Sequence, residues 1–217
     1  MVSQFFEGLE GSDVRVVVAA ATTRRFSPDA IICEQGGSAD QFFLLSNGRA
    51  RFFSLTPDGR KTILHWLVQG DILGVAALLL KPSRYRLSAE TVRESTLLIW
   101  SRERMRALLD RYPRLCQNAL STGADYLDWY IAAHAALTSD TAQQRLGSVL
   151  AHLADAIGRE VSGGVELRVT NEELANAANI TTFTASRILS GWQAERVVTK
   201  RRGSIILHSA ARLFPTA

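Results

Sequence analysis

Cysteine is scarce in this chain, which has only Cys33 and Cys116 among its 217 residues. Two distant cysteines provide neither a disulfide framework nor the paired spacing of a zinc site. They also exclude an iron–sulfur cluster held by four cysteines of this chain. We therefore expect reduced cysteines, as in a cytoplasmic protein.

Long apolar runs are missing as well. The longest, Ile72 to Leu80, has nine residues, whereas a membrane-spanning helix needs about 20. The first nine residues have neither the basic start nor the apolar stretch of a signal peptide. These absences predict a cytoplasmic protein without membrane contact.

Motifs for enzymatic and metal chemistry are also lacking. No glycine-rich phosphate loop, paired catalytic carboxylates or Ser/His/Asp motif is recognisable. The four histidines share no metal-ligand spacing with one another or with a cysteine. We therefore predict no enzyme and no metal site.

Positive charge gathers near the C-terminal end. From Thr170 onward there are six Lys and Arg against three Asp and Glu, while the other residues hold 19 against 18. A local basic excess of this kind is the electrostatic footprint of a nucleic-acid-binding segment.

The stretch from Thr170 to Trp192 has the pattern of two short helices joined by a tight turn. Thr170 and Glu173 have capping-box spacing, and Thr181 is placed to cap the second helix. One apolar stripe at helical spacing predicts the buried side of that helix. The stripe consists of Ala185, Ile188, Leu189 and Trp192.

The opposite face of the second helix has short polar side chains, one phenylalanine and one arginine. Such a face suits the major groove of DNA, although two helices of an ordinary core are the alternative. The segment Val197 to Leu207 predicts two strands around a basic turn, which would complete a winged helix-turn-helix. The residues expected to contact DNA are Thr170, Thr181, Thr182, Phe183, Ser186, Arg187, Ser190, Lys200, Arg201 and Arg202.

Short apolar runs separated by turn signals follow one another from Phe26 to about residue 100. A break about every ten residues is typical of an antiparallel barrel or sandwich. A parallel sheet would need crossover helices, for which these runs leave no room.

Five segments of this region carry a family resemblance by their order and spacing. They are residues 26–32 (FSPDAII), 34–36 (EQG), 43–49 (FLLSNGR), 57–60 (PDGR) and 70–74 (GDILG). With the helix-turn-helix at the far end, nearly the whole chain resembles the Crp/Fnr superfamily of bacterial transcription regulators, which includes the cyclic-AMP receptor protein and FNR.

The resemblance implies an α+β fold in three parts. A double-stranded β-helix, the jelly roll of cyclic-nucleotide-binding domains, would occupy residues 1–110 and sense an effector. A dimerisation helix would follow at 111–138, and a winged helix-turn-helix at 139–217. Such a homodimer reads a near-palindromic site on double-stranded DNA with half-sites about 34 Å apart. Contact with RNA polymerase is also implied, without an assigned surface.

Two positions of the second helix are informative against the family pattern. Arg187 matches the recognition arginine, so we expect it to donate to a guanine edge. Phe183 stands where a glutamate or another polar reader is usual. A phenylalanine there can only meet thymine methyl groups or fold inward.

The resemblance places an effector site between Gly70 and Thr91 and on the long helix. Cyclic-nucleotide binders have a glutamate for the ribose after this turn, but here Val75 follows Gly74. Since an unpaired ligand hydroxyl costs about 1–3 kcal/mol, we expect an effector other than cyclic AMP or cyclic GMP. The expected effector residues are Gly70, Asp71, Leu73, Gly74, Val75, Ala76, Arg84, Arg86, Ser88, Tyr126 and Tyr130.

Two groups in this set have alternative roles. Arg84, Arg86 and Ser88, on one side of an expected strand, either clamp an anion or are solvated. Tyr126 and Tyr130 either touch an effector or pack against the barrel.

The segment from Pro113 to Leu137 predicts one long helix without internal proline. Mostly apolar residues at steps of three and four predict a coiled-coil-like seam along it. The seam consists of Leu115, Ala119, Thr122, Tyr126, Tyr130, Ala133 and Leu137. By resemblance this is the dimer helix.

Three alternatives for the function stay open. In the first alternative the protein is a haem-based gas sensor, as some members of the superfamily are, with His65 or His134 as axial ligand, so the cofactor is unknown. In the second it is a constitutive regulator whose pocket is filled by its own side chains. In the third it is a ligand-binding module that signals by protein contact, which weak salt dependence of DNA binding would reveal.

Overall fold

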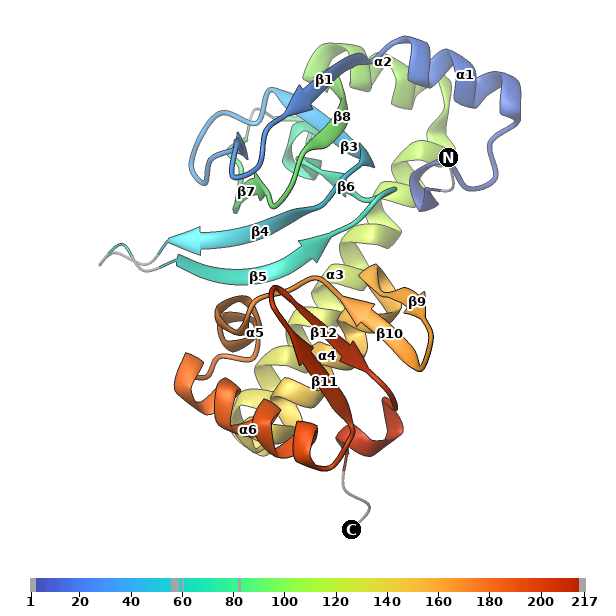
Figure 1. Ribbon diagram of the computed structural model, residues 1–217. Helices are drawn as coiled ribbons and strands as arrows, with labels where there is room; N and C mark the ends of the chain where they lie inside the picture. The colour runs from blue at the N-terminus through green and yellow to red at the C-terminus, as the bar shows by residue number, and fades with distance from the viewer. Residues whose placement is uncertain (1–2, 56–58, 60, 82, 215–217) are drawn as a thin grey trace. The chain divides into compact units, whose positions relative to one another are not determined.

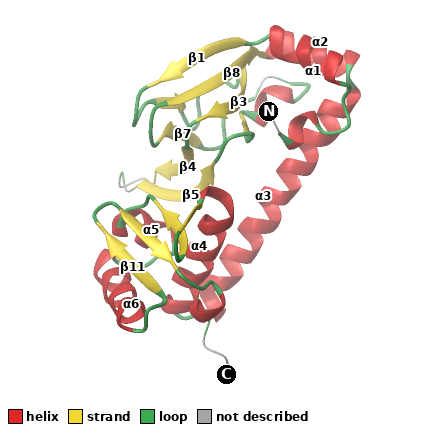
Figure 2. Cartoon of the chain, turned by 45° about the vertical axis from the view of Figure 1, so that its right-hand side comes forward, coloured by secondary structure: helices red, strands yellow, loops and turns green. Residues whose placement is uncertain are grey.

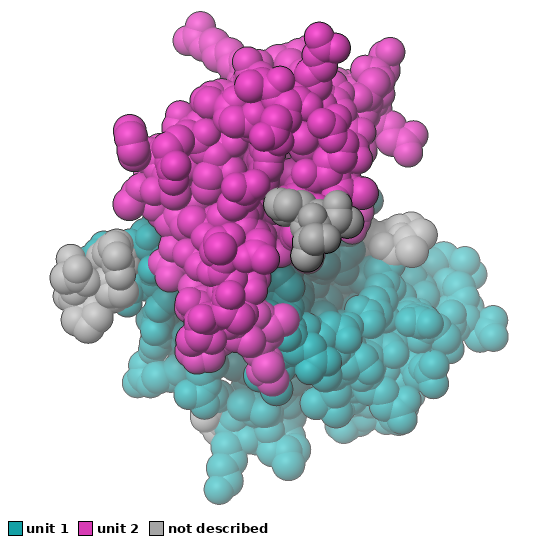
Figure 3. Space-filling view, turned by 90° about the horizontal axis from the view of Figure 1, so that it is seen from below, with its two compact units in different colours: residues 1–130 teal, residues 131–217 magenta. Residues whose placement is uncertain are grey.

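The computed structural model describes residues 3–55, 59, 61–81 and 83–214 (Figure 1). The chain forms two compact units, Met1–Tyr130 and Ile131–Ala217, which are coloured separately in Figure 3. No helix among the described residues is long and apolar enough to cross a membrane.

The first unit is mainly β structure, with helices before and after the strands. Its elements are η1 (Gln4–Phe6), α1 (Gly11–Ala19), β1 (Thr22–Phe26), β2 (Ile31–Cys33), β3 (Gln41–Asn47), β4 (Ala50–Leu55), β5 (Lys61–Leu67), β6 (Ile72–Leu73), η2 (Val75–Leu78), β7 (Ser88–Thr91), β8 (Ser95–Ser101), α2 (Arg102–Arg111) and the long helix α3 (Pro113–Ser139), which continues into the second unit.

The strands form two antiparallel four-stranded sheets, in the orders β1-β8-β3-β6 and β2-β7-β4-β5. Side chains from both sheets meet in one buried core, in which Phe42 contacts Trp100 at 6.0 Å between ring centroids. The indole nitrogen of Trp100 donates to the carbonyl oxygen of Val17 in α1. This arrangement confirms the predicted sandwich of the cyclic-nucleotide-binding type. Of the turn predicted at residues 57–60, only Gly59 lies within the described residues.

The first half of α3 packs on this core. Leu115 and Ala119 belong to the buried cluster, and Thr122 is also buried. The side-chain amide of Asn118 donates to the carbonyl oxygens of Phe5 and Glu7 at 3.0 and 2.9 Å. The first half of the predicted coiled-coil seam therefore faces its own barrel, and the seam prediction was wrong there.

A different apolar stripe of α3 is exposed. Leu120, Leu127 and Ile131 are 66%, 59% and 60% exposed. They are separated by seven and four residues, which places them on one side of a helix. Because α3 is apolar on two sides, only the tertiary contacts distinguish the side that faces the barrel.

The second unit combines helices with a small sheet, as Figure 2 shows. After α3 its elements are α4 (Ala142–Ile157), β9 (Arg159–Val161), β10 (Gly164–Leu167), α5 (Asn171–Ala177), α6 (Thr182–Ala194), β11 (Val198–Arg201), β12 (Ser204–Leu207) and η3 (Ala211–Leu213).

The sheet of the second unit is antiparallel, in the order β11-β12-β10-β9. Leu150 of α4, Leu174 of α5 and Leu189 of α6 are fully buried, so each helix contributes an apolar face to the interior. Helix pair α5–α6 followed by hairpin β11–β12 is the predicted winged helix-turn-helix.

Candidate nucleic-acid interface and effector site

The start of α5 is closed by a reciprocal pair of hydrogen bonds. The backbone N–H of Thr170 donates to the Glu173 carboxylate at 2.8 Å, and the N–H of Glu173 donates to the Thr170 hydroxyl at 3.2 Å. This is the predicted capping box. The Thr170 hydroxyl, which was predicted to contact DNA, is therefore already engaged in capping α5.

The turn between α5 and α6 depends on one left-handed residue. Asn179 has φ of 50°, a conformation that asparagine tolerates better than most residues. The N–H of Ile180 returns to the carbonyl oxygen of Ala175 at 3.0 Å. Thr181 then caps α6, because its hydroxyl accepts from the N–H of Thr184 at 3.1 Å.

The two faces of α6 differ, as the sequence predicts, except that Ile188 of the predicted buried stripe is only half-buried because it lies at the edge of that face. Ala185, Leu189 and Trp192 are buried, whereas Thr182, Phe183 and Arg187 are exposed. Phe183 is 79% exposed, which excludes the alternative that it folds inward.

The two serines of this face differ in exposure and are both hydrogen-bonded. Ser186 is only half-buried, and its carbonyl oxygen accepts from the hydroxyl of Ser190 at 2.8 Å. Ser190 is exposed, and its hydroxyl also accepts from the Lys200 ammonium at 3.1 Å. Ser190 therefore joins β11 to α6.

The wing is a hairpin with a two-residue turn. Arg201 pairs with Ser204, and Gly203 in the turn has φ of 74°, which glycine adopts without strain. Arg201 and Arg202 are exposed at this tip. Basic side chains at a hairpin tip suit phosphate contacts.

Arg145 of α4 is a supporting residue that the sequence analysis missed. Its guanidinium donates to the carbonyl oxygen of Asp140 at 2.7 Å and to that of Ala178 at 3.1 Å. It thus ties the C-terminal end of α5 to the segment before α4. Its partner Ala178 is 33 residues away, so no local motif indicated this contact.

The turn before η2 contains most of the predicted effector residues. Gly74 has φ of 80°, and a Cβ there would lie 2.7 Å from the carbonyl oxygen of Gln41, so glycine is required. Leu73 is fully buried in the core. Val75 and Ala76 are only partly buried and pack against that core.

Asp71 lies at the tip of this turn. Its carboxylate accepts from the N–H of Val68 at 2.7 Å, next to the hydroxyl of Ser3, which donates to the carbonyl oxygen of Gly70. Burial raises the pKa of Asp71 to about 6, and the Val68 hydrogen bond opposes part of this shift.

Of the two alternatives for Arg84, Arg86 and Ser88, the anion clamp is not assembled, and both arginines are exposed. Strand β7 begins at Ser88, so Arg84 and Arg86 precede it. The guanidinium of Arg84 donates to the carbonyl oxygen of Gly36 at 2.6 Å. The hydroxyl of Ser88 is buried and accepts from the N–H of Gln35 at 2.9 Å. The prediction that these three residues share one side of a strand was wrong, because the regular pairing of β7 begins only at Ser88, four residues after Arg84.

A buried carboxylate in the same sheet was missed. Glu90 of β7 is 3% exposed and accepts from Arg51 of β4 at 2.7 Å and from Lys61 of β5 at 2.6 Å. These partners lie 39 and 29 residues away. No local motif could therefore have indicated this cluster.

Tyr126 and Tyr130 of α3 belong to an aromatic cluster with strands β4 and β5. Tyr126 lies 6.1 Å from Phe52 and 4.8 Å from His65, between ring centroids. Trp129 lies 5.0 Å from His65 and 5.1 Å from Tyr130. Tyr126 therefore packs against the strands, whereas the ring next to Tyr130 is that of Trp129 on the same helix.

The hydroxyls of both tyrosines are buried and make no hydrogen bond within the described part of the chain. Burial raises the pKa of Tyr130 to about 12 and that of Tyr126 further, the latter also through the nearby Asp71. Both phenols are therefore neutral at physiological pH. They present hydrogen-bonding groups beside the aromatic rings of the cluster and, for Tyr126, near Asp71.

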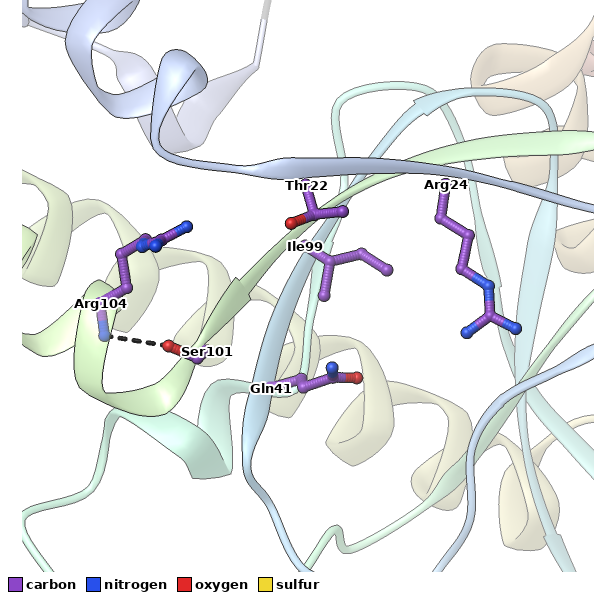
Figure 4. Close-up of a pocket in the computed structure, with 6 residues that line it drawn as sticks. All are labelled: Thr22, Arg24, Gln41, Ile99, Ser101 and Arg104. Atoms are coloured by element: carbon purple, nitrogen blue, oxygen red, sulfur yellow. Dashed lines mark hydrogen bonds between the residues drawn. The ribbon is translucent and has the colours of Figure 1, made fainter.

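The first unit has two hollows that differ in how many of the predicted effector residues line them. The larger, about 330 Å³, lies over β1, β8 and the start of α2, and contains none of that set. Figure 4 shows its lining: Thr22, Arg24, Gln41, Ile99, Ser101 and Arg104. The smaller, about 100 Å³, lies beside Ser3, Gly70, Asp71 and Thr122.

The histidines considered for haem differ in environment. His65 is enclosed by the rings of Tyr126 and Trp129, so a haem ligated there would have to displace one of them. His134 is exposed on α3. Among the described residues, no three His, Cys, Asp or Glu side chains gather as a metal site.

Comparison with known proteins matches both units. Residues 23–112 match the cyclic nucleotide-binding domain, and residues 144–214 match the Crp-like helix-turn-helix domain. The cyclic AMP receptor protein of Thermus thermophilus is 27% identical over 97% of this chain and 95% of its own length. The anaerobic regulatory protein of Bacillus subtilis is 24% identical over 87% of this chain and 80% of its own length.

Solved structures share the fold. The global regulator CLP of Xanthomonas campestris, described as responsive to c-di-GMP, superimposes with a TM-score of 0.80 at 19% identity. The match covers 92% of this chain and all of that one. The two matched domains follow each other in the same order as in these relatives, with the long helix between them. The chain therefore belongs to the Crp/Fnr superfamily of transcription regulators.

Proposed function

We propose that this protein is a homodimeric, sequence-specific regulator of transcription that binds double-stranded DNA through α6 and the β11–β12 wing. The observation that carries the proposal is the exposed front of α6. There Thr182, Phe183 and Arg187 project from a helix whose opposite side is buried. A helix anchored in this way, beside a basic hairpin, suits major-groove recognition with phosphate contacts at its edge.

The exposed stripe Leu120, Leu127 and Ile131 supports dimerisation through α3. These side chains are more than half exposed, and their spacing resembles one side of a coiled coil. A second copy of the same helix presents the same stripe, so the contact is self-complementary. Two recognition helices related by such symmetry fit a near-palindromic operator.

The effector in this proposal is a small molecule other than a cyclic nucleotide. No carboxylate follows Gly74, Arg84 is bonded to a backbone carbonyl, and Arg86 is exposed. Among the predicted effector residues, the buried side-chain groups without a hydrogen-bond partner are the hydroxyls of Tyr126 and Tyr130. They favour an uncharged, partly apolar molecule that offers hydrogen-bonding atoms to both phenols.

DNA binding is tested by fluorescence anisotropy with an operator selected from a random library. We expect a dimer on each operator and an affinity that falls steeply as salt rises from 50 to 200 mM, because Lys and Arg displace counterions from phosphates. Flat salt dependence and no selected sequence would instead favour the ligand-binding protein-interaction module.

The effector is tested by native mass spectrometry and visible absorption of the freshly purified protein. Additional mass that is lost in a Tyr126→Phe, Tyr130→Phe double variant would support a ligand at the two phenols. A Soret band would support the haem alternative. A bare protein that binds its operator fully would support the constitutive alternative, in which the aromatic cluster fills the site.

Contact with RNA polymerase is part of the proposal as well. It is supported by the family, whose relatives are named as regulators and activators of transcription. In vitro transcription from a promoter that carries the selected operator tests it, and the sign of the change distinguishes activation from repression.

A further inference from the structure

Phe183 is an apolar ring in a polar and basic setting. It is 79% exposed, the most exposed large apolar side chain among the described residues 131–214. It is the second residue of α6 after the cap at Thr181. Single exposed apolar side chains are common on protein surfaces, so the place of this ring on the front of α6, together with its exposure, is what indicates a contact.

The neighbours of Phe183 identify the kind of partner. Arg187 lies four residues later on the same face of α6, and Thr182 beside it is exposed. The ammonium of Lys200 is held against the same helix through Ser190. A partner that covers Phe183 must therefore tolerate two cations close by, which favours a polyanion with one apolar spot.

The major groove of DNA presents one kind of apolar group to a protein. Phenylalanine has no hydrogen-bond donor or acceptor, so it cannot read the amino, carbonyl or ring-nitrogen groups of the base edges. The apolar group in the groove is the C5-methyl of thymine. A 5-methylcytosine presents the same methyl group at the same place on the pyrimidine ring.

We propose that Phe183 is a specificity-determining residue that recognises a pyrimidine C5-methyl group in each half-site of the operator. It accepts thymine or 5-methylcytosine and discriminates against unmethylated cytosine. DNA binding by this protein is therefore sensitive to cytosine methylation where the contacted base is a cytosine. This inference rests on the proposed function, because it presumes that α6 enters the major groove.

The test replaces single thymines of the selected operator by deoxyuridine, which removes the methyl group and keeps every hydrogen-bonding atom. At one position per half-site we expect about fourfold weaker binding, or about fifteenfold when both half-sites are changed, since a buried methyl group contributes about 0.8 kcal/mol. At the same position a C·G pair lowers affinity, and 5-methylcytosine recovers about fourfold of the loss per half-site.

Three variants separate the ring from its surroundings. Phe183→Ala should bind thymine and deoxyuridine probes equally, while Phe183→Leu should keep part of the difference. Arg187→Ala is the matched control on the same face: it should lose preference at its guanine but keep the methyl dependence. Because Phe183 is exposed, its variants should unfold at the wild-type temperature.

The outcomes are distinct. If wild-type protein binds thymine and deoxyuridine equally at every position, or if Phe183→Ala keeps the difference, the inference is overturned. A Phe183→Ala variant that changes oligomeric mass instead would assign the ring to a contact between copies. If no DNA sequence is selected at all, the proposed function itself has failed before the methyl test begins.

Discussion

The ammonium of Lys200 lies 3.1 Å from the hydroxyl of Ser190, so the first strand of the wing is joined directly to the recognition helix. The backbone N–H of Lys200 also donates to the side-chain oxygen of Gln193 in the same helix, at 3.3 Å. Both bonds place the Lys200 charge at the side of α6, next to the face that carries Arg187.

This position predicts a sequence-independent role for Lys200. Lys200→Ala should weaken binding to operator and random DNA alike and lower the salt slope by about 1 per half-site, as expected for one phosphate contact. Ser190→Ala is the control, because it removes the hydrogen bond but keeps the charge, and should leave the slope unchanged. A loss confined to the operator would instead assign Lys200 to a base.

For Arg187, in contrast to Lys200, we expect a sequence-specific role. Arg187→Ala should lower operator affinity by about 1–3 kcal/mol per half-site and relax the preference at one guanine, because a bidentate contact to guanine is lost. Titration of a set of single-base operator variants measures both effects. Equal weakening on operator and random DNA would show that Arg187 contacts only phosphate.

The exposed stripe of α3 predicts the dimer contact. Leu127→Glu should convert the dimer into a monomer, because it places a charge in the centre of an apolar seam. Ser121→Glu introduces the same charge at an exposed position beside the stripe and should leave a dimer. Light scattering measures the mass; a dimeric Leu127→Glu variant would contradict the assigned face.

Gly74 predicts a large effect of a small substitution. Gly74→Ala places a methyl group 2.7 Å from the carbonyl oxygen of Gln41 at a φ of 80°, so it adds a clash to backbone strain. Gly36→Ala is a matched control with φ of 81° and open space around it. We expect about 1–2 kcal/mol of destabilisation for Gly36→Ala and clearly more for Gly74→Ala in urea unfolding. Equal losses would mean that the turn relaxes around the methyl group.

Asp71 predicts a pH dependence of stability. Burial raises its pKa to about 6 in the folded chain from the ordinary value of 3.8, so the folded state binds the extra proton between these values. The contribution of Asp71 to the free energy of unfolding therefore falls as pH rises from about 4 to 6, by an amount on the order of 3 kcal/mol, and stays low above that range. Asp71→Asn should remove this decline.

The comparison of unfolding free energies at pH 4 and pH 7 measures the effect. The difference between wild type and Asp71→Asn is the quantity to follow, because other carboxylates titrate in the same window. If the two proteins show the same pH dependence, the carboxyl group of Asp71 is not desolvated in solution.

The sequence alone determined the local features of the DNA-binding unit. The Thr170–Glu173 capping box, the turn at Asn179 and the apolar stripe of α6 each depend on residues within about one or two helical turns of one another. Short-range hydrogen bonds and helical periodicity therefore decide them wherever the segment lies. The order of turn motifs likewise predicted the sandwich of the first unit, because strand breaks are set by local backbone chemistry.

The tertiary structure decided what depends on distant partners. Both sides of α3 are apolar, and only packing on the barrel separates the buried Leu115 and Ala119 from the exposed Leu120 and Leu127. Glu90 meets Arg51 and Lys61 across three strands, and Arg84 is turned to a backbone carbonyl. Such contacts join residues tens of positions apart, and their free energies depend on burial and geometry that arise only when the sheets and the helix assemble.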